Sequence, residues 1–331
     1  MAPDRVFLTG ASGFVGAHVL RALLASGYCV RALVRDASRI AFDDDVEWIN
    51  GDLTRTGDFA HALDGCRYVV HTAALYSFSP YERAGIYDVN VGGTASLFAA
   101  AHLAGVERAV LTSSSATIGH ARGSQPADES CYPVDRPFAA QRGDYHASKV
   151  EQERAAFASR VPVVAVLPTA PVGPGDWKPT PTGKLVRDFA RGKIAAMPPP
   201  GGGMNLVAVE DVAAGHVAAL ERGRLGERYV LGGENLEMDA VWRLLAEVTG
   251  RPLPGFRAPY PLAYAVAAAD ELRCRIDVDA VPFAPLEGVR MSRERMYADS
   301  SKARRELGFA PTRVRDALER STIWYRENGA A

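Results

Sequence analysis

The 331-residue sequence has few cysteines and no excess of charge of either sign. Its four cysteines lie far apart in the chain, at Cys29, Cys66, Cys131 and Cys274. This spacing predicts neither a disulfide framework nor a zinc site, and reduced thiols in the cytoplasm are expected. Lys and Arg number 38 against 39 Asp and Glu, which gives a net charge of −1. The basic surface that a nucleic acid partner requires is therefore not expected.

Long apolar runs are also missing, since no stretch reaches the ~18 uninterrupted apolar residues of a membrane span. The closest segment, 258–269, is ended by Asp270 and Glu271. It could touch a membrane surface or cover an apolar ligand, but we favour a helix buried in a smaller lobe. The first residues lead directly into a β-rich run without a charged and apolar leader. We therefore expect a cytoplasmic protein without a signal peptide.

The first half of the chain alternates short β-rich runs with longer helical stretches. The predicted strands are Val6–Thr9, Val30–Val34, Val46–Ile49, Tyr68–His71, Ala109–Thr112 and Val163–Leu167. They are mostly apolar on both faces, as parallel strands covered by helices are. The predicted helices are Val15–Ser26, Gly93–Ala104 and Ser148–Ala158, with Gly27 and Gly105 as C-caps of the first two. This alternation predicts an α/β fold with a Rossmann-type, doubly wound parallel sheet.

The composition changes near Pro168. Residues 168–205 are rich in proline and glycine, which predicts a loop system rather than a core element. Regular structure is expected again in Glu210–Glu221, Arg228–Leu231 and Met238–Thr249. We therefore expect a Rossmann domain in 1–167. A smaller, loop-rich lobe in 168–331 would bind the substrate at the carboxyl edge of the sheet and return partly to that sheet.

A glycine-rich turn follows the first predicted strand and opens the first helix. Gly10 permits a tight turn, Gly13 lets the backbone approach a pyrophosphate, and Gly16 allows close packing of helix on strand. The N–H groups at the start of the helix offer partial positive charge to phosphates. The remaining predicted contacts of this turn are Ser12, Phe14 and Val15. The pattern predicts NAD(P) binding by residues 1–167.

The end of the second predicted strand carries no acid at the position that bonds the ribose hydroxyls of NAD. Val34 occupies this position and Arg35 follows it. An arginine there can stack on adenine and pair with a 2′-phosphate, so we favour NADP. Asp36 keeps NAD as the alternative, in which Arg35 is a solvated surface residue. Contacts to the cofactor are also expected after the third and fourth strands, from Asp52, Leu53, Ala73 and Ala74.

Tyr145 and Lys149 are four residues apart, which places them on one face of a helix. A tyrosine with a pKa of about 10 is a poor general acid or base at neutral pH. A nearby ammonium lowers that pKa by favouring the phenolate, and the same lysine can hold the nicotinamide ribose. The run Ser113–Ser115 follows the fifth strand, where a hydroxyl can donate to a substrate oxygen.

In this order, the motifs resemble those of extended short-chain dehydrogenase/reductases, in the NAD-dependent epimerase/dehydratase superfamily. The glycine triplet, His71–Ala74, Tyr87–Thr94, the serine run and the Tyr/Lys pair carry the resemblance over nearly the whole chain. Val30–Asp36 resembles dihydroflavonol 4-reductases, which use NADP. The second half is similar to the hopanoid-associated sugar epimerase group. The matching segments of that half are 179–183, 205–207, 211–216, 221–235, 288–291 and 301–308.

The resemblance implies a role for each residue of the pair. Tyr145 would be the acid/base, Lys149 its partner, and Ser114 or Ser115 the donor to the substrate oxygen. Alignment with the reductases selects Ser114, whereas alignment with galactose epimerases selects Ser115. Asn90 would fix the active-site backbone or a water chain. A homodimer through paired helices is also implied.

The resemblance further implies that Pro168 and Thr169 lie beside the nicotinamide. Two departures from the family pattern concern the substrate. Ala208 stands where a histidine is usual, and the segment after the sixth strand lacks the asparagine that sugar-nucleotide enzymes carry there. These departures weaken the nucleotide-sugar interpretation and leave the hydride chemistry unaffected.

Three functions agree with these residues. In the first, NADPH reduces a ketone or aldehyde of a fairly apolar small molecule, and Tyr145 supplies the proton. In the second, tightly held NAD oxidises and epimerises a nucleotide sugar whose pyrophosphate contacts Arg187 or Arg290. The third is a non-catalytic dinucleotide sensor, which has no need of the intact Ser, Tyr and Lys. Arg35 favours the first, together with four aromatic residues that could surround the substrate: Tyr76, Phe78, Trp177 and Tyr260.

Overall fold

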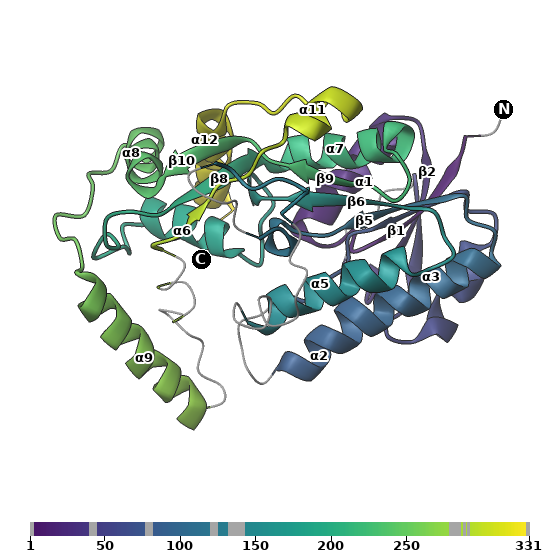
Figure 1. The fold of residues 1–331 in the computed structure, drawn as a ribbon, viewed down its shortest axis with the longest axis horizontal. Helices are drawn as coiled ribbons and strands as arrows, with labels where there is room; N and C mark the ends of the chain where they lie inside the picture. Colours follow the sequence, from purple (N-terminus) through teal and green to yellow (C-terminus); the bar gives the residue numbers. More distant parts are fainter. Residues whose placement is uncertain are drawn as a thin grey trace.

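The computed structural model describes residues 3–39, 45–76, 82–119, 125–131, 143–277, 286, 289 and 292–328. Seven parallel strands form one sheet in the order β3-β2-β1-β4-β5-β6-β9 (Figure 1). They are β1 (Arg5–Thr9), β2 (Cys29–Val34), β3 (Val46–Asn50), β4 (Tyr68–His71), β5 (Arg108–Thr112), β6 (Val163–Pro168) and β9 (Arg228–Leu231). The strand order reverses between β1 and β4, which confirms the predicted Rossmann-type, doubly wound sheet.

Helices cover both faces of this sheet. One side carries α1 (Phe14–Ala25), α7 (Val209–Arg222) and α11 (Ser301–Leu307). The other carries α3 (Thr94–Leu103) and α5 (Asp144–Phe157), below the sheet in Figure 1. Strand β1 shows why the strands are apolar throughout, because Val6 and Leu8 enter the first core and Phe7 enters the second. The predicted C-caps Gly27 and Gly105 adopt positive φ of 83° and 78°.

Short helical segments connect these layers. They are the 3-10 turns η1 (Ala37–Arg39), η2 (Thr56–Asp58), η3 (Ala60–Leu63) and η6 (Ser115–Thr117), the α-helix α2 (Arg83–Tyr87) and the π-helix η5 (Asp88–Gly93). The π-helix lies directly between α2 and α3 and carries Asn90. Local π-helices often occur at functional sites, because they change the direction in which a side chain points.

A second, smaller sheet contains β7 (Ala170–Val172), β8 (Gly203–Ala208), β10 (Glu234–Glu237) and β11 (Arg295–Met296). It packs with α6 (Pro181–Ala190), α8 (Met238–Thr249) and α12 (Val314–Glu327) around a core of its own. The prediction of a loop system throughout 168–205 is therefore wrong. The Thr180 side chain accepts a hydrogen bond from Gly183 N, and Pro181 occupies the first turn, so these breakers begin a helix.

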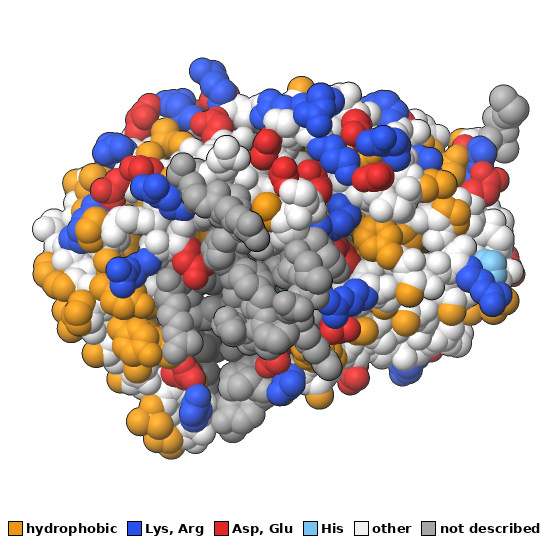
Figure 2. Space-filling view, in the orientation of Figure 1, with side chains coloured by type: hydrophobic (Ala, Val, Ile, Leu, Met, Phe, Trp, Pro, Cys, Tyr) orange, Lys and Arg blue, Asp and Glu red, His pale blue; other side chains and the backbone are white. Residues whose placement is uncertain are grey.

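Helix α9 (Tyr260–Ile276) corrects a second prediction, that of a helix buried in the smaller lobe. It lies at the lower left of the molecule in Figure 1, and hydrophobic side chains occupy the same rim in Figure 2. Only Ala267 and Asp270 are buried, whereas Leu272 and Ile276 are 59% and 80% exposed. Among the described residues, no helix has both the length and the apolar character that crossing a membrane requires.

Candidate active site

The turn after β1 fits a dinucleotide because its glycines allow very close contacts. Gly10 has φ +78°, and a Cβ atom there would lie 2.6 Å from Ala73 N. A Cβ atom on Gly16 would overlap the carbonyl oxygen of Gly10. Gly13 is the N-cap of α1 and no side chain caps that end, so the first N–H groups of the helix can bind phosphate. Ser12 and Gly13 are exposed, Phe14 and Val15 half-buried.

Replacing Gly16 with alanine is expected to displace this turn. The added methyl group meets Gly10 and lies 2.6 Å from Thr72 Oγ1, and neither neighbour is the free end of a long side chain. We expect a loss of about 1–3 kcal/mol in unfolding free energy, together with weaker cofactor binding. Urea denaturation and fluorescence titration with NADP⁺ measure the two effects. Gly57→Ala is the control, because no atom lies within 4 Å of its added Cβ; native-like binding by Gly16→Ala would contradict the role of close packing.

The residues expected to contact the adenosine half follow β2, β3 and β4. Arg35 is exposed directly after β2, and Asp36 Oδ1 accepts hydrogen bonds from the backbone N and the hydroxyl of Ser38. Asp52 Oδ1 similarly accepts from the backbone and hydroxyl of Thr54, and these bonds lower its pKa. Leu53 is buried against Gly93. Ala73 lies beside Gly10 and Ala74 is exposed, as passage close to a cofactor requires.

Tyr145 and Lys149 both lie on α5, which begins at Asp144 and not, as predicted, at Ser148. Gly143, with φ +97°, precedes the helix, and Asp144 places a negative charge in its first turn. Lys149 is buried, and its Nζ donates to Thr112 O at 2.8 Å and to Gln152 Oε1. Burial lowers the pKa of Lys149 to about 7, an effect that Glu153 partly opposes.

The Tyr145 hydroxyl hydrogen-bonds to the side chain of Ser114. Burial raises the pKa of Tyr145 to about 12, and the bond to Ser114 acts in the opposite direction. Lys149 is not among the groups that shift this pKa, so the lowering expected from a neighbouring ammonium does not occur, and desolvation is the largest cause. Ser113 is buried beside Thr117, and Ser115 begins the 3-10 turn η6. Of the three serines, Ser114 is the one in contact with Tyr145.

Asn90 connects the π-helix to the first turn of α5. Its Oδ1 accepts from Leu75 N at 2.7 Å, and its Nδ2 donates to Leu75 O and to Ser148 Oγ. Ser148 Oγ in turn donates to Tyr145 O at 2.7 Å. Asn90 thus holds the segment after β4 against the backbone of Tyr145, the arrangement expected of a residue that fixes the active-site backbone.

A buried polar network below Lys149 was not predicted from the sequence. Gln152, Thr94 and His71 are all buried, and Gln152 Nε2 donates to Thr94 Oγ1 at 2.9 Å. The ring of His71 lies between Thr94 Oγ1 and Thr9 Oγ1, at 2.8 Å and 2.6 Å. Burial lowers the pKa of His71 to about 3, so the ring is neutral. The sequence signal was available, since Gln152 is a polar residue one turn after Lys149 on the same face.

Residues at the carboxyl end of β6 and just after it form another wall of the candidate site. Pro168 is the last residue of β6 and is buried, and Thr169 Oγ1 donates to Asn205 Oδ1 at 2.8 Å. Arg187 pairs with its neighbour Asp188 at 2.8 Å. It lines a cavity of about 560 Å³ between α6 and α12, together with Arg191, Lys193, Arg251 and Arg326. Arg290 lies outside the described residues.

Three of the four predicted aromatic residues are described, and they contact different neighbours. The rings of Tyr76 and Tyr145 contact each other with centroids 4.4 Å apart. Trp177 packs edge-on against Trp324, and Tyr260 lies on α9 beside Tyr264. Phe78 lies outside the described residues. Among the three described members of this set, Tyr76 is the one with a ring contact to Tyr145.

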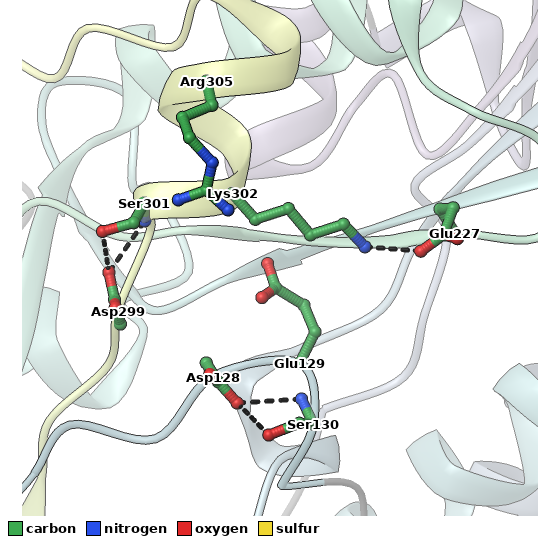
Figure 3. A pocket seen from close by; sticks show the side chains of 8 residues that line it. All are labelled: Asp128, Glu129, Ser130, Glu227, Asp299, Ser301, Lys302 and Arg305. Carbon is green, nitrogen blue, oxygen red and sulfur yellow. Dashed lines mark hydrogen bonds and ion pairs between the residues drawn. The ribbon is translucent and has the colours of Figure 1, made fainter.

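A separate cavity of about 460 Å³ lies at the other end of β9 (Figure 3). Two of its charged groups pair with each other, since Lys302 Nζ bonds Glu227, and Ser301 bonds Asp299. Glu227, which lines this cavity, immediately precedes β9. Thr169, a predicted site residue, lies at the carboxyl end of the same strand, where its N–H bonds Leu231 O. No predicted site residue lines this cavity, and the described residues contain no group of three or more potential His, Cys, Asp or Glu metal ligands.

A glycine turn at the point where strand order reverses, with a tyrosine and a lysine at the carboxyl edge, defines an NAD(P)-dependent oxidoreductase of the extended short-chain type. The chain belongs to the NAD dependent epimerase/dehydratase family, whose model matches residues 6–232. It is therefore an enzyme of the class that includes dehydrogenases, reductases and epimerases acting on small molecules.

The similar proteins match nearly the whole chain. A Synechocystis sp. protein described as a "Putative dihydroflavonol 4-reductase" is 39% identical over 98% of this chain and 96% of its own. The "Sterol demethylase protein B" of Methylococcus capsulatus is 36% identical, over 97% and 98%. The crystal structure of gox2253 superposes with a TM-score of 0.83 at 37% identity, covering 99% of both chains.

Proposed function

We propose that this enzyme uses NADPH to reduce a ketone or aldehyde on a fairly apolar small molecule. The observation that carries the proposal is the contact of Tyr145 with Ser114 at the carboxyl edge of the sheet, one helical turn from the buried Lys149. When bound, NADPH supplies a hydride to the carbonyl carbon. The division into a cofactor domain in 1–167 and a substrate lobe in 168–331 is part of the proposal, as is a homodimer.

Tyr145 supplies the proton in this proposal. Because burial holds its pKa at about 12, the phenol is protonated at neutral pH and can act as an acid toward the carbonyl oxygen. Ser114 donates a second hydrogen bond to that oxygen as negative charge develops on it. Lys149, when protonated, stabilises the phenolate that remains and donates to the nicotinamide ribose. Asn90 keeps the backbone of Tyr145 in place through Ser148.

An apolar substrate is supported by the surroundings of Tyr145 and by the relatives. The ring of Tyr76 covers one side of Tyr145, so the acid lies next to an aromatic wall. The relatives' descriptions name a dihydroflavonol, which is a polyphenol with two aromatic rings, and a sterol, which is a largely hydrocarbon ring system. The alternative, a nucleotide-sugar epimerase, is weakened because Arg187 is already paired with Asp188 and Ala208 replaces the usual histidine.

One experiment separates the two functions. Mass spectrometry of the purified protein identifies retained cofactor, and oxidation of NADPH and NADH is then followed with a panel of ketones and aldehydes. The reductase is expected to carry little bound NAD and to oxidise NADPH faster than NADH. Stoichiometric bound NAD without any preference for NADPH would contradict the proposal and support the epimerase.

The preference for NADP is tested at Arg35. This guanidinium is exposed at the end of β2, whereas the carboxylate of Asp36 is engaged by Ser38. In Arg35→Ala, the affinity for NADPH is expected to fall by about tenfold and that for NADH to change little, because only NADPH carries the 2′-phosphate. Fluorescence titration measures both constants, with the exposed Arg160→Ala as control. Equal losses for the two cofactors would show that Arg35 does not read the 2′-phosphate.

A further inference from the structure

Gln152 is buried directly beside the lysine that the proposed mechanism requires. It lies three residues after Lys149 on α5, and its exposed surface is 0%. Its Oε1 accepts a hydrogen bond of 2.5 Å from Lys149 Nζ, while its Nε2 donates to Thr94 Oγ1 at 2.9 Å. The oxygen and the nitrogen of the Gln152 amide are therefore both hydrogen-bonded to protein groups, and the side chain is not exposed to water.

The donors and acceptors of this network have one consistent arrangement. An ammonium can only donate, so the amide oxygen must face Lys149 and the NH2 group must face Thr94. Thr94 Oγ1 donates to Asn90 O at 2.7 Å, so it accepts from both Gln152 Nε2 and His71 Nε2. The Nδ1 atom of His71 then accepts from the hydroxyl of Thr9, at the last residue of β1. The directions of these hydrogen bonds allow one orientation of the Gln152 side-chain amide.

Lys149 Nζ has two protein acceptors among the described residues. Nζ donates one hydrogen bond to Thr112 O, at the end of β5, and a second to Gln152 Oε1. An ammonium has three hydrogens, so the third is available to a ligand bound at the carboxyl edge of the sheet. The two acceptors lie on different elements, and together they determine the direction of that third N–H.

We propose that Gln152 is a positioning residue, which orients the Lys149 ammonium toward the nicotinamide ribose and stabilises its charged form. This inference rests on the proposed cofactor site, and it adds to that site a residue that does not itself touch the cofactor. Loss of the amide oxygen would leave a buried ammonium with Thr112 O as its protein acceptor. The charged form of Lys149 would then be less stable, and the neutral amine would be populated at a lower pH.

Other titratable groups face the same region from each neighbouring element. On α5, Glu153 favours the charged form of Lys149, and Arg228 of β9 partly neutralises Glu153. From β4, the neutral His71 would oppose that form only if it were protonated. From α7, His216 bonds Thr112 Oγ1 and is neutral, since burial lowers its pKa to about 4. Tyr145 is protonated and therefore carries no charge. Gln152 is also neutral, and it contacts the Lys149 ammonium directly from the same helix, α5.

The test is the pH dependence of NADP⁺ binding, measured by fluorescence titration from about pH 5.5 to about pH 9.5. The ribose contact needs the ammonium, so the contribution of this contact to affinity is constant below the pKa of Lys149 in the free protein and falls above it. In Gln152→Leu, the midpoint of this fall is expected to move down by about one pH unit. In Gln152→Glu, the added carboxylate moves it up by a similar amount. A purely structural role would not produce shifts of opposite sign.

Two controls identify the titrating group. Gln125→Leu makes the same chemical change at an exposed glutamine and should keep the native midpoint. Lys149→Met should remove the fall that Lys149 causes and leave only the titration of the 2′-phosphate of NADP⁺, whose pKa is about 6. Identical midpoints in the native chain, Gln152→Leu and Gln152→Glu would overturn the proposal, as would a native midpoint that survives in Lys149→Met. No turnover is measured, so a failure of the reductase assignment appears in the NADPH oxidation assay and a failure of this inference appears here.

Discussion

Tyr145→Phe is expected to lower the rate of the proposed NADPH-dependent carbonyl reduction by about 10²–10⁴-fold, the usual contribution of a positioned general acid. The substitution removes one oxygen atom and the hydrogen bond to Ser114. It keeps the ring, so the packing against Tyr76 at a centroid distance of 4.4 Å is preserved. The cofactor-binding turn after β1 is on a different element. We therefore expect the dissociation constant for NADPH to change by less than about twofold.

The measurement is a single-turnover rate with saturating NADPH, together with a titration of cofactor binding. Tyr28→Phe is a matched control. Tyr28 packs against Tyr68 at the amino end of β2, whereas the candidate site lies at the carboxyl edge of the sheet. It should retain the native rate. If Tyr145→Phe kept a substantial fraction of that rate, another group would have to supply the proton, and the assignment of Tyr145 would be wrong.

The serine run gives this prediction a second comparison. Ser114 contacts the Tyr145 hydroxyl, whereas Ser115 lies in η6. We expect Ser114→Ala to lower the rate by about 10²-fold, the scale of removing one donor to a developing oxyanion. Ser115→Ala should cost much less. The reverse order would indicate the register of the galactose epimerases and with it a different substrate pose.

Local sequence patterns were sufficient to predict the sheet and the glycine turn after β1. Strands such as Tyr68–His71 are mostly apolar on both faces because helices cover both sides of the sheet. Each strand shows this pattern in its own residues, so it can be recognised without knowledge of the other strands. The glycines of the turn are similarly local, since Gly10 needs a positive φ and Gly16 cannot carry a side chain. The i, i+4 spacing of Tyr145 and Lys149 survives an error of four residues in the start of α5.

Features that depend on contacts between distant segments could not be predicted. Helix α6 forms among breaker residues because Val186 and Phe189 pack into the core that includes α12, more than a hundred residues later. The exposure of α9 depends on which elements surround it, and its sequence reads equally well as a core helix. The pKa of Tyr145 was expected to be lowered by Lys149, but Lys149 does not contribute to the shift, and desolvation by burial raises the pKa instead.

The ion pair of Arg228 and Glu153 is another long-range feature, and it is expected to dominate the stability of the region around the site. Glu153 is 0% exposed, and Arg228 Nε lies 3.1 Å from its Oε2. Arg228 also donates to Thr117 O and to Glu129 O, so one guanidinium joins β9, α5 and two loops. Removing one member of such a pair leaves an uncompensated charge in the interior.

Arg228→Met is therefore expected to lower the free energy of unfolding by about 3–5 kcal/mol, measured by urea denaturation. Arg67→Met is the matched control: Arg67 also pairs with acids, Asp4 and Glu107, but its side chain is 46% exposed. Water screens those pairs, so the loss there should be much smaller than in Arg228→Met. Similar losses in the two variants would show that the interior charge is not what makes Arg228 important.

A double variant separates the buried charge from the lost contacts. If Glu153 is replaced with leucine in the Arg228→Met background, no charge is left unpaired, and much of the lost stability is expected to return. The part that does not return measures the hydrogen bonds of Arg228 to Thr117 and Glu129, together with the bond from Thr117 Oγ1 to Glu153 Oε1 that the leucine also removes. In the single variant, the unneutralised Glu153 also raises the pKa of Lys149, because its carboxylate already acts in that direction. The pH midpoint of NADP⁺ binding should therefore move upward in Arg228→Met and downward in the double variant, which links the stability of this ion pair to the charge of the active-site lysine.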